Sequence, residues 1–92
     1  MHAVLVNVTI DPESADEATA QLQSDVVPRL KQAPGFVAGY WAGAPSEGSG
    51  RSFQVFESEG AAQQAAEMVK SQPPPKGVTI DSVEVREIIA SA

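Results

Sequence analysis

The first segment whose pattern predicts a β-strand is 3–10, which is rich in β-branched residues. Successive side chains of a strand point to opposite faces. One face of this segment carries Val4, Val6, Val8 and Ile10, and the other carries Ala3, Leu5, Asn7 and Thr9. Because the first face is wholly apolar and the second is mostly so, we expect this strand to lie inside a sheet that is covered on both sides.

The second predicted strand, 36–42, carries three of the five aromatic residues of the chain. Its alternation places Phe36, Ala38, Tyr40 and Ala42 on one face and Val37, Gly39, Trp41 and Gly43 on the other. Two glycines beside a tryptophan leave space, so we expect another group to approach the backbone at this point.

Two further strands are predicted after this one. In 51–57 the residues Phe53 and Val55 share one face, whereas Gln54 and Phe56 share the other. In 78–89 the apolar positions shift from even to odd numbers at Asp81-Ser82. A shift of one residue predicts a β-bulge or a break at this position.

The helical pattern is clearest in a long segment from Ser14 to about Ala33. Its buried stripe repeats every four residues, at Ala18, Leu22, Val26 and Leu30. The spacing of Ser14 and Glu17 is that of a capping box. Pro28 lacks an amide hydrogen, so we expect an interruption near 24–28, and Pro34-Gly35 ends the helix.

A second helix is predicted over 59–71, with Ser58 as its N-cap. Its apolar positions follow the helical spacing of three and four residues, at Ala62, Ala65, Ala66 and Val69. A helix lined with alanine lies close to the sheet that it covers. Three consecutive prolines, 73–75, prevent its continuation.

The order strand, helix, strand, strand, helix, strand predicts an α+β protein with a ferredoxin-like βαββαβ arrangement. Such a fold has a four-stranded antiparallel sheet with both helices on one face. We expect one domain over 1–92. Because both faces of the first strand are apolar, the free face of the sheet also needs a cover, and a two-fold homodimer packed sheet against sheet supplies one.

Composition excludes several classes of partner. The formal net charge is −6, and the six Lys and Arg residues are scattered without forming a basic stripe, so we expect neither nucleic acid nor an anionic membrane surface as a partner. The chain has no cysteine, and its first residues do not resemble a signal peptide. No apolar run approaches the roughly 20 residues that span a bilayer. We therefore expect a cytoplasmic protein.

In the order of its elements, the chain resembles the dimeric α+β barrel superfamily, and within it the antibiotic-biosynthesis-monooxygenase-like domains. The residues that carry the resemblance are Asn7 and Pro12 around the first strand, Pro34-Gly35-Phe36 at the corner after the first helix, and 53–58, Phe-Gln-Val-Phe-Glu-Ser, before the second helix. The resemblance implies a ferredoxin-like subunit in a dimeric α+β barrel. The group contains cofactor-free quinone-forming oxygenases, haem-degrading enzymes and small proteins with no established activity.

The haem-degrading branch resembles this chain at Asn7, where that branch has an asparagine in its pocket. That branch also has a tryptophan in the second helix and an iron-binding histidine near the end of this helix. Here the helix carries Ala65 and Ala66, residues 70–77 contain no histidine, and His2 is the sole histidine. We therefore expect no haem and no other cofactor. A lone histidine without cysteine also predicts no metal site.

Three residues are candidates for binding a ligand: Asn7, Tyr40 and Trp41. An amide in a β-branched strand needs hydrogen bonds, which a ligand, a neighbouring strand or a two-fold mate can supply. The two aromatic residues can contact a flat ligand or pack at a core or dimer interface. His2 is either a general base or a solvated or interface residue of the terminal strand. No arrangement of residues identifies a catalytic group.

Two functions fit these observations. One is a non-catalytic or ligand-binding member of the monooxygenase-like group, which forms a homodimer and takes up a small hydrophobic ligand. The alternative is a cofactor-free monooxygenase that acts on a small aromatic or hydrophobic substrate. In both cases Asn7, Tyr40 and Trp41 are expected to orient the ligand in an apolar cleft between the helices and the sheet.

Overall fold

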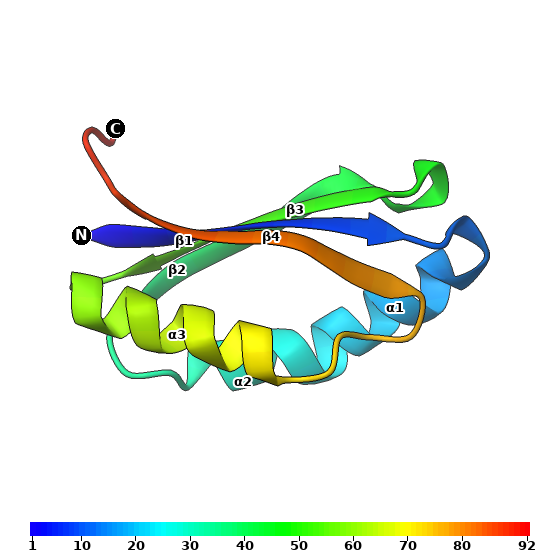
Figure 1. Cartoon of the computed structure of the whole chain (residues 1–92), viewed down its shortest axis with the longest axis horizontal. Helices are drawn as coiled ribbons and strands as arrows, with labels where there is room; N and C mark the ends of the chain where they lie inside the picture. Colours follow the sequence, from blue (N-terminus) through cyan, green and yellow to red (C-terminus); the bar gives the residue numbers. More distant parts are fainter.

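A four-stranded antiparallel sheet with its helices on one face makes up the structure, a computed structural model that describes all 92 residues (Figure 1). The strands are β1 (His2–Ile10), β2 (Phe36–Ala44), β3 (Ser49–Phe56) and β4 (Val78–Glu87). They lie in the order β2-β3-β1-β4, and every neighbouring pair is antiparallel. The predicted ferredoxin-like fold is therefore confirmed. No helix of the structure is both long enough and apolar enough to cross a membrane.

The first helical region consists of several short pieces that follow one another. They are η1 (Pro12–Ser14), α1 (Ala15–Gln21), the π-helical turn η2 (Leu22–Val26) and α2 (Val27–Lys31). The amide of Val27 donates to the carbonyl of Leu22, five residues back, in place of the usual four. Pro28, which has no amide to donate, follows immediately. The predicted interruption near 24–28 is confirmed as a wide turn within an otherwise continuous helix.

The predicted capping box at Ser14 is wrong. An extra turn, η1, precedes α1, and its N-cap is Asp11, whose carboxylate accepts a hydrogen bond from the amide of Glu13 at 3.1 Å. The side chain of Ser14 makes no capping hydrogen bond, because this residue already lies within the turn. The second predicted cap is confirmed: α3 (Glu59–Ser71) begins with the amide of Ala61 donating to Ser58 Oγ at 3.1 Å.

The core lies between the sheet and α3. Strand residues Val4, Val6 and Phe56 pack there against three alanines of the helix, Ala62, Ala65 and Ala66, all of which are buried. The short alanine side chains let the helix approach the sheet closely, as the sequence predicted. Large apolar side chains are few in this layer, so they leave space beside it unfilled.

Phe36 was predicted on the same face of β2 as Ala38 and Tyr40, and this assignment is wrong. Phe36 pairs with Phe56, but the next register pair is Ala38 with Val55, so β2 contains a bulge. The bulge turns Phe36 toward the helices, where its ring meets that of Phe56 edge to face at 5.8 Å. The predicted bulge in β4 is confirmed, because the partner of β1 shifts there from Ser82 to Ile80.

The other face of the sheet carries no helix (Figure 1). Apart from Arg51, its β2–β3 side is largely apolar, with Tyr40 at 69% exposure and Phe53 at 39% exposure. Leu5 extends this apolar area onto β1, whereas the β4 side is polar and includes Ser82 and Glu84. The chain exposes 5731 Å², compared with about 5,100 Å² for an average folded monomer of its 9.6 kDa mass. The structure therefore leaves surface uncovered that a partner or a ligand can bury.

Candidate functional site

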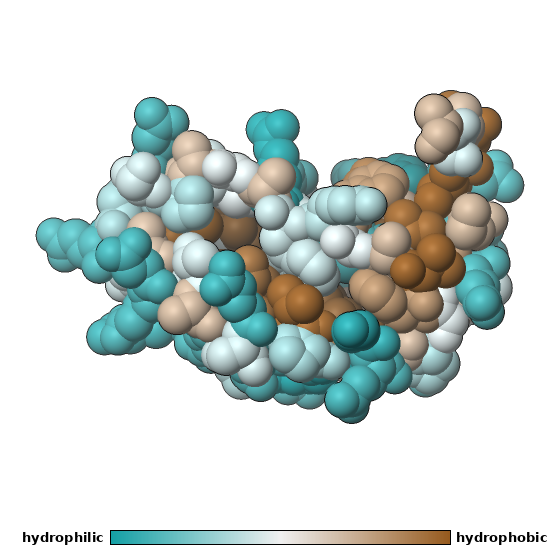
Figure 2. Space-filling view, turned by 180° about the vertical axis from the view of Figure 1, so that it is seen from behind, coloured by the Kyte–Doolittle hydropathy of each residue, from teal (hydrophilic) through white to brown (hydrophobic).

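A cleft of about 480 Å³ opens between the sheet and the helices. This volume lies within the range of about 300–1,000 Å³ that is usual for small-molecule sites. Apolar side chains from every part of the fold line it, among them Val6, Val8 and Ile10 of β1, Leu22, Val26, Val27 and Leu30 of the first helical region, Val69 of α3, and Ile80 of β4. Figure 2 shows a hollow with hydrophobic atoms at its base, with hydrophilic atoms to its left and below it. The lining suits a mainly apolar ligand.

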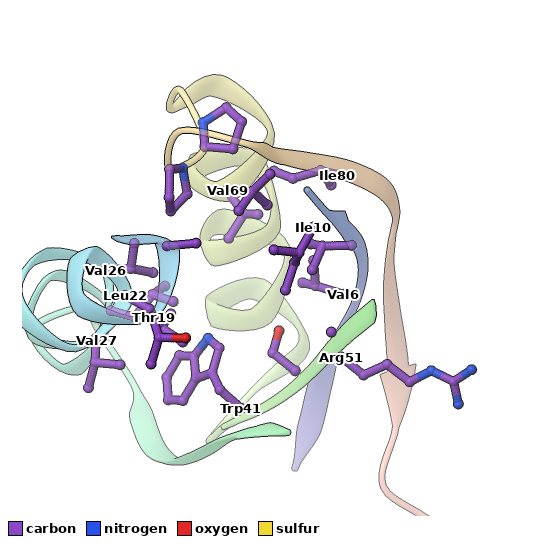
Figure 3. Close-up of a pocket in the computed structure, with 18 of the residues that line it drawn as sticks. Val6, Ile10, Thr19, Leu22, Val26, Val27, Trp41, Arg51, Val69 and Ile80 are labelled. Carbon is purple, nitrogen blue, oxygen red and sulfur yellow. The ribbon is translucent and has the colours of Figure 1, made fainter. Parts of the chain in front are cut away.

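Trp41 is the largest side chain in this cleft and enters it from β2 (Figure 3). A Cβ atom placed on Gly39 would lie only 2.9 Å from Cη2 and Cζ3 of the tryptophan ring. The ring therefore lies over Gly39. The space that the sequence predicted beside the tryptophan exists, but at Gly39 the ring of Trp41 itself occupies it. Glycine at this position is thus required for the observed orientation of the ring.

The other two candidate residues do not lie in this cleft. Asn7 is on the helix-free face of the sheet, where its Nδ2 donates to Ser82 Oγ on the neighbouring strand at 2.9 Å. This hydrogen bond corresponds to the alternative in which a neighbouring strand satisfies the amide. Tyr40 lies on the same helix-free face and is exposed. The structure therefore does not bring the three residues together, and their ligand-binding roles stay predictions.

Gln54 is a candidate that the sequence reasoning did not select. It lies on the helix-facing side of β3, between Val4 of β1 and Gly39 of β2 in the register. The residue is 1% exposed and lines the cleft, yet neither Nε2 nor Oε1 of its amide has a hydrogen-bond partner. The sequence did contain a signal, because the alternation of 51–57 placed this polar residue on the same face as Phe56.

Few other polar groups face the cleft, and none of them is acidic. The lining contains the side chains of Thr19, Gln23, Ser52 and Gln72 but no Asp, Glu, His or Lys. Of its two arginines, Arg51 points away from the cleft (Figure 3). The other, Arg29, contacts Asp25 Oδ2 at 2.6 Å and donates to Gln72 Oε1 at 3.4 Å, which links α2 to the end of α3. The interior of the cleft is therefore close to electrically neutral.

His2 lies away from this cleft, at the beginning of β1. Its Nε2 is 3.7 Å from Glu59 Oε2, and its buried Nδ1 has no hydrogen-bond partner. The structure contains no group of three or more His, Cys, Asp or Glu residues that could hold a metal ion. Neither of the two roles considered for His2 is tested by this arrangement.

No protein-family model and no curated protein sequence matches the chain. Solved structures do match it over nearly its whole length. HapK from Hahella chejuensis is 14% identical, with a TM-score of 0.70 over 100% of this chain and 96% of that one. SnoaB from Streptomyces nogalater, a cofactor-independent oxygenase, is 14% identical, with a TM-score of 0.61 over 98% of this chain and 95% of that one.

A mutant of MhuD with two manganese protoporphyrin IX molecules per active site is 17% identical, with a TM-score of 0.62 over 98% of this chain and 97% of that one. The cleft between the helices and the sheet offers no ligand for the metal of a porphyrin. The residues that line it include no histidine, cysteine or tyrosine that could bind a porphyrin metal, and His2 is not among them. The likeness of the chain to these structures confirms the fold: the chain has the ferredoxin-like fold of HapK, SnoaB and MhuD.

Proposed function

We propose that this protein binds a small hydrophobic molecule in the cleft between helices and sheet, and that it does so without catalysing a reaction. The observation that carries the proposal is the open apolar cleft of about 480 Å³ with Trp41 inside it. In a tightly packed domain, few voids are larger than a water molecule. A space of this size therefore costs dispersion contacts, which a bound apolar ligand restores.

The chemistry of the lining supports binding over catalysis. General acid–base catalysis needs a side chain that can take or give a proton within hydrogen-bond reach of the substrate. The cleft offers hydroxyl, amide and indole groups, together with the guanidinium of Arg29, which is held by Asp25 at the rim. None of these is a usual base near neutral pH. They are suited to orienting a ligand.

We also propose that the protein works as a homodimer that buries the apolar part of its helix-free sheet face. Tyr40 and Phe53 are exposed there, opposite each other in the register of β2 and β3. Exposed aromatic side chains at the centre of an apolar area are typical of interface cores. A second copy placed by a two-fold axis offers the same area in return. On this proposal Tyr40 serves the interface, whereas Trp41 serves the cleft.

The alternative function is a cofactor-free monooxygenase. The likeness in fold to SnoaB, a cofactor-independent oxygenase, favours it, with a TM-score of 0.61. In such a reaction the substrate itself supplies the electrons: one oxygen atom of O₂ enters the substrate and the other leaves as water. The cleft would then contribute position and exclusion of water, with Trp41 against an aromatic substrate.

Calorimetric titration with naphthalene-like aromatic probes tests the binding proposal. We expect saturable binding by the wild-type protein, and at least a tenfold loss of affinity in Trp41→Ala, because the main apolar wall is removed. The matched variant is Tyr40→Ala, which removes an aromatic ring on the opposite face, and we expect it to bind like the wild type. Absence of binding by the wild type, or an equal loss in both variants, would contradict the proposal.

Oxygen uptake separates the two functions. If the protein only binds its ligand, a panel of dihydroxy-aromatic compounds should consume oxygen at the same rate with and without it. A protein-dependent rate that falls in Trp41→Ala would instead establish the monooxygenase function. Sedimentation of the same samples measures whether the protein is a dimer under these conditions.

A further inference from the structure

The amide of Gln54 is the feature of the cleft that packing alone does not explain. Both of its polar atoms are buried and neither has a hydrogen-bond partner. Its helix-facing neighbours include Val4 beside it on β1, and Phe56 and Ser52 two residues away on the same strand. A buried amide without partners is costly, and native proteins rarely keep one without a reason. Methionine or leucine would fill this position without that cost.

Other polar groups of the cleft do not relieve this arrangement. The side chains of Thr19, Gln23, Trp41 and Ser52 also line the cleft, and none takes part in the side-chain hydrogen bonds of the structure. Gln72 also lines it, and its Oε1 accepts from Arg29. None of these groups bonds to Gln54 in the structure. A partner from outside the chain can therefore satisfy the amide.

We propose that Gln54 recognises a ligand that carries a hydrogen-bond donor and an acceptor next to each other, as in a cis-amide or lactam. The carboxamide presents one acceptor, Oε1, and two hydrogens on Nε2, all in one plane. A lactam presents its N–H and its C=O on the same edge, so the two planar groups form a pair of parallel hydrogen bonds. This inference rests on the proposed binding function and adds the chemical class of the ligand.

Charge balance supports a neutral ligand. A carboxylate or ammonium group placed beside Gln54 would be buried without a countercharge, because the guanidinium of Arg29 is held at the rim by Asp25 at 2.6 Å. Burying an unpaired charge costs far more than burying a neutral polar group. A neutral amide satisfies both atoms of Gln54 without this cost. The remaining body of the ligand is apolar, as the cleft is.

A ligand reaches the amide only when a lining side chain turns aside, since both polar atoms are shielded from solvent. Trp41 is the side chain placed to do this. Its ring lies over Gly39, which is the direct register neighbour of Gln54, and no hydrogen bond fixes the indole. Binding of a lactam is therefore coupled to a change in the environment of Trp41, the single tryptophan of the chain.

Three bicyclic probes of similar size test this inference: indane with no polar group, indanone with an acceptor only, and oxindole with an adjacent donor and acceptor. Affinities are measured by calorimetry, and the indole N–H of Trp41 is followed by nuclear magnetic resonance. We expect oxindole to bind the wild-type protein about tenfold or more tightly than indanone, because only oxindole has an N–H that can donate to Oε1 of Gln54, an acceptor that indanone leaves unpaired. We also expect it to shift the indole resonance.

In Gln54→Met the ratio of the oxindole and indanone affinities should fall to about one, because the side chain keeps its length and loses both polar functions. The matched control is Gln63→Met on the exposed face of α3, which should keep the wild-type ratio. Equal affinities for oxindole and indanone in the wild type, as expected if an ordered water satisfies the amide, would overturn the inference. So would a ratio that survives in Gln54→Met. If indane, indanone and oxindole all fail to bind, the proposed binding function itself fails.

Discussion

Replacing Gln54 by methionine should stabilise the free protein, although it removes the most distinctive polar group of the cleft. The two side chains have similar length and flexibility, so the substitution changes polarity more than volume. In the wild type the amide atoms are buried without partners. The unfolded chain exposes the same amide to water, where it is fully hydrogen-bonded. Folding therefore loses these hydrogen bonds in the wild type and loses nothing comparable in the variant.

The size of the effect follows from the number of unpaired groups. An unsatisfied buried polar group costs about 1–3 kcal/mol, and the carboxamide contains a donor and an acceptor group. Some relaxation of the neighbouring side chains reduces the sum, so we expect a gain in the free energy of unfolding of about 2 kcal/mol. For a domain of 60–100 residues, a change of about 1 kcal/mol moves Tm by roughly 4–8 °C. The expected rise in Tm is therefore roughly 8–16 °C.

Urea unfolding followed by circular dichroism, together with a thermal melt, measures this change without any ligand. Gln63→Met serves as the control, because Gln63 is exposed on α3 and its substitution should alter stability by less than about 0.5 kcal/mol. A Gln54→Met protein that is less stable than the wild type would refute the reasoning. It would mean that the amide is satisfied in the folded protein in solution, and that the cleft has no unpaired polar group to offer.

Three further substitutions test the packing of the cleft and of the sheet. Gly39→Ala places a Cβ 2.9 Å from the ring of Trp41. It should therefore displace the ring, lower the free energy of unfolding by about 1–3 kcal/mol and shift the tryptophan fluorescence. The control is Gly60→Ala, whose added Cβ meets no atom within 4 Å and should have none of these effects. In sedimentation, Phe53→Asp should turn the proposed homodimer into monomers, because it charges the apolar part of the helix-free face. A dimer that persists would remove this face as the interface. Phe56→Ala should cost about 3–5 kcal/mol of unfolding free energy in a urea titration, since Phe56 is completely buried, and a loss below about 1 kcal/mol would contradict the described core.

The fold was predictable because several separate features of the sequence agree with one another. The β-branched alternation of 3–10, the alanine stripe of α3 and the prolines that end both helices all favour the same arrangement. The β4 bulge was visible as well, because polar residues there mark the change of phase. The bulge after Phe36 was not visible, since Phe36, Val37 and Ala38 are all apolar and a shift among apolar residues leaves the pattern unchanged.

The candidate site was only partly predictable, for a geometric reason. Tyr40 and Trp41 are consecutive residues of one strand, so they point to opposite faces of the sheet, and only one of them can face the helices. The sequence does not state which face the helices cover at this strand. Asn7 was selected because its amide can form hydrogen bonds, but the alternation of the strand places it on the other face of the sheet from Val6 and Val8. Gln54 lies on the helix-facing side of its strand, and a polar residue at such a core position was the informative signal.

The cleft and the uncovered sheet face have one physical origin, which leads to a last prediction. The chain has only five aromatic residues, and alanines supply much of its core, so it lacks the bulk to fill its own interior or to cover its sheet. A ligand that binds only the folded state stabilises it by about 2.7 kcal/mol at a concentration of 100 times Kd. Saturating oxindole should therefore raise the wild-type Tm by roughly 10–20 °C, given the sensitivity of a domain of this size. Gln54→Met should begin from a higher Tm and gain less from the lactam, because the same unpaired amide that weakens the free protein is what the ligand satisfies. If both proteins gain equally, Gln54 contributes nothing to binding, and its burial without partners has another cause.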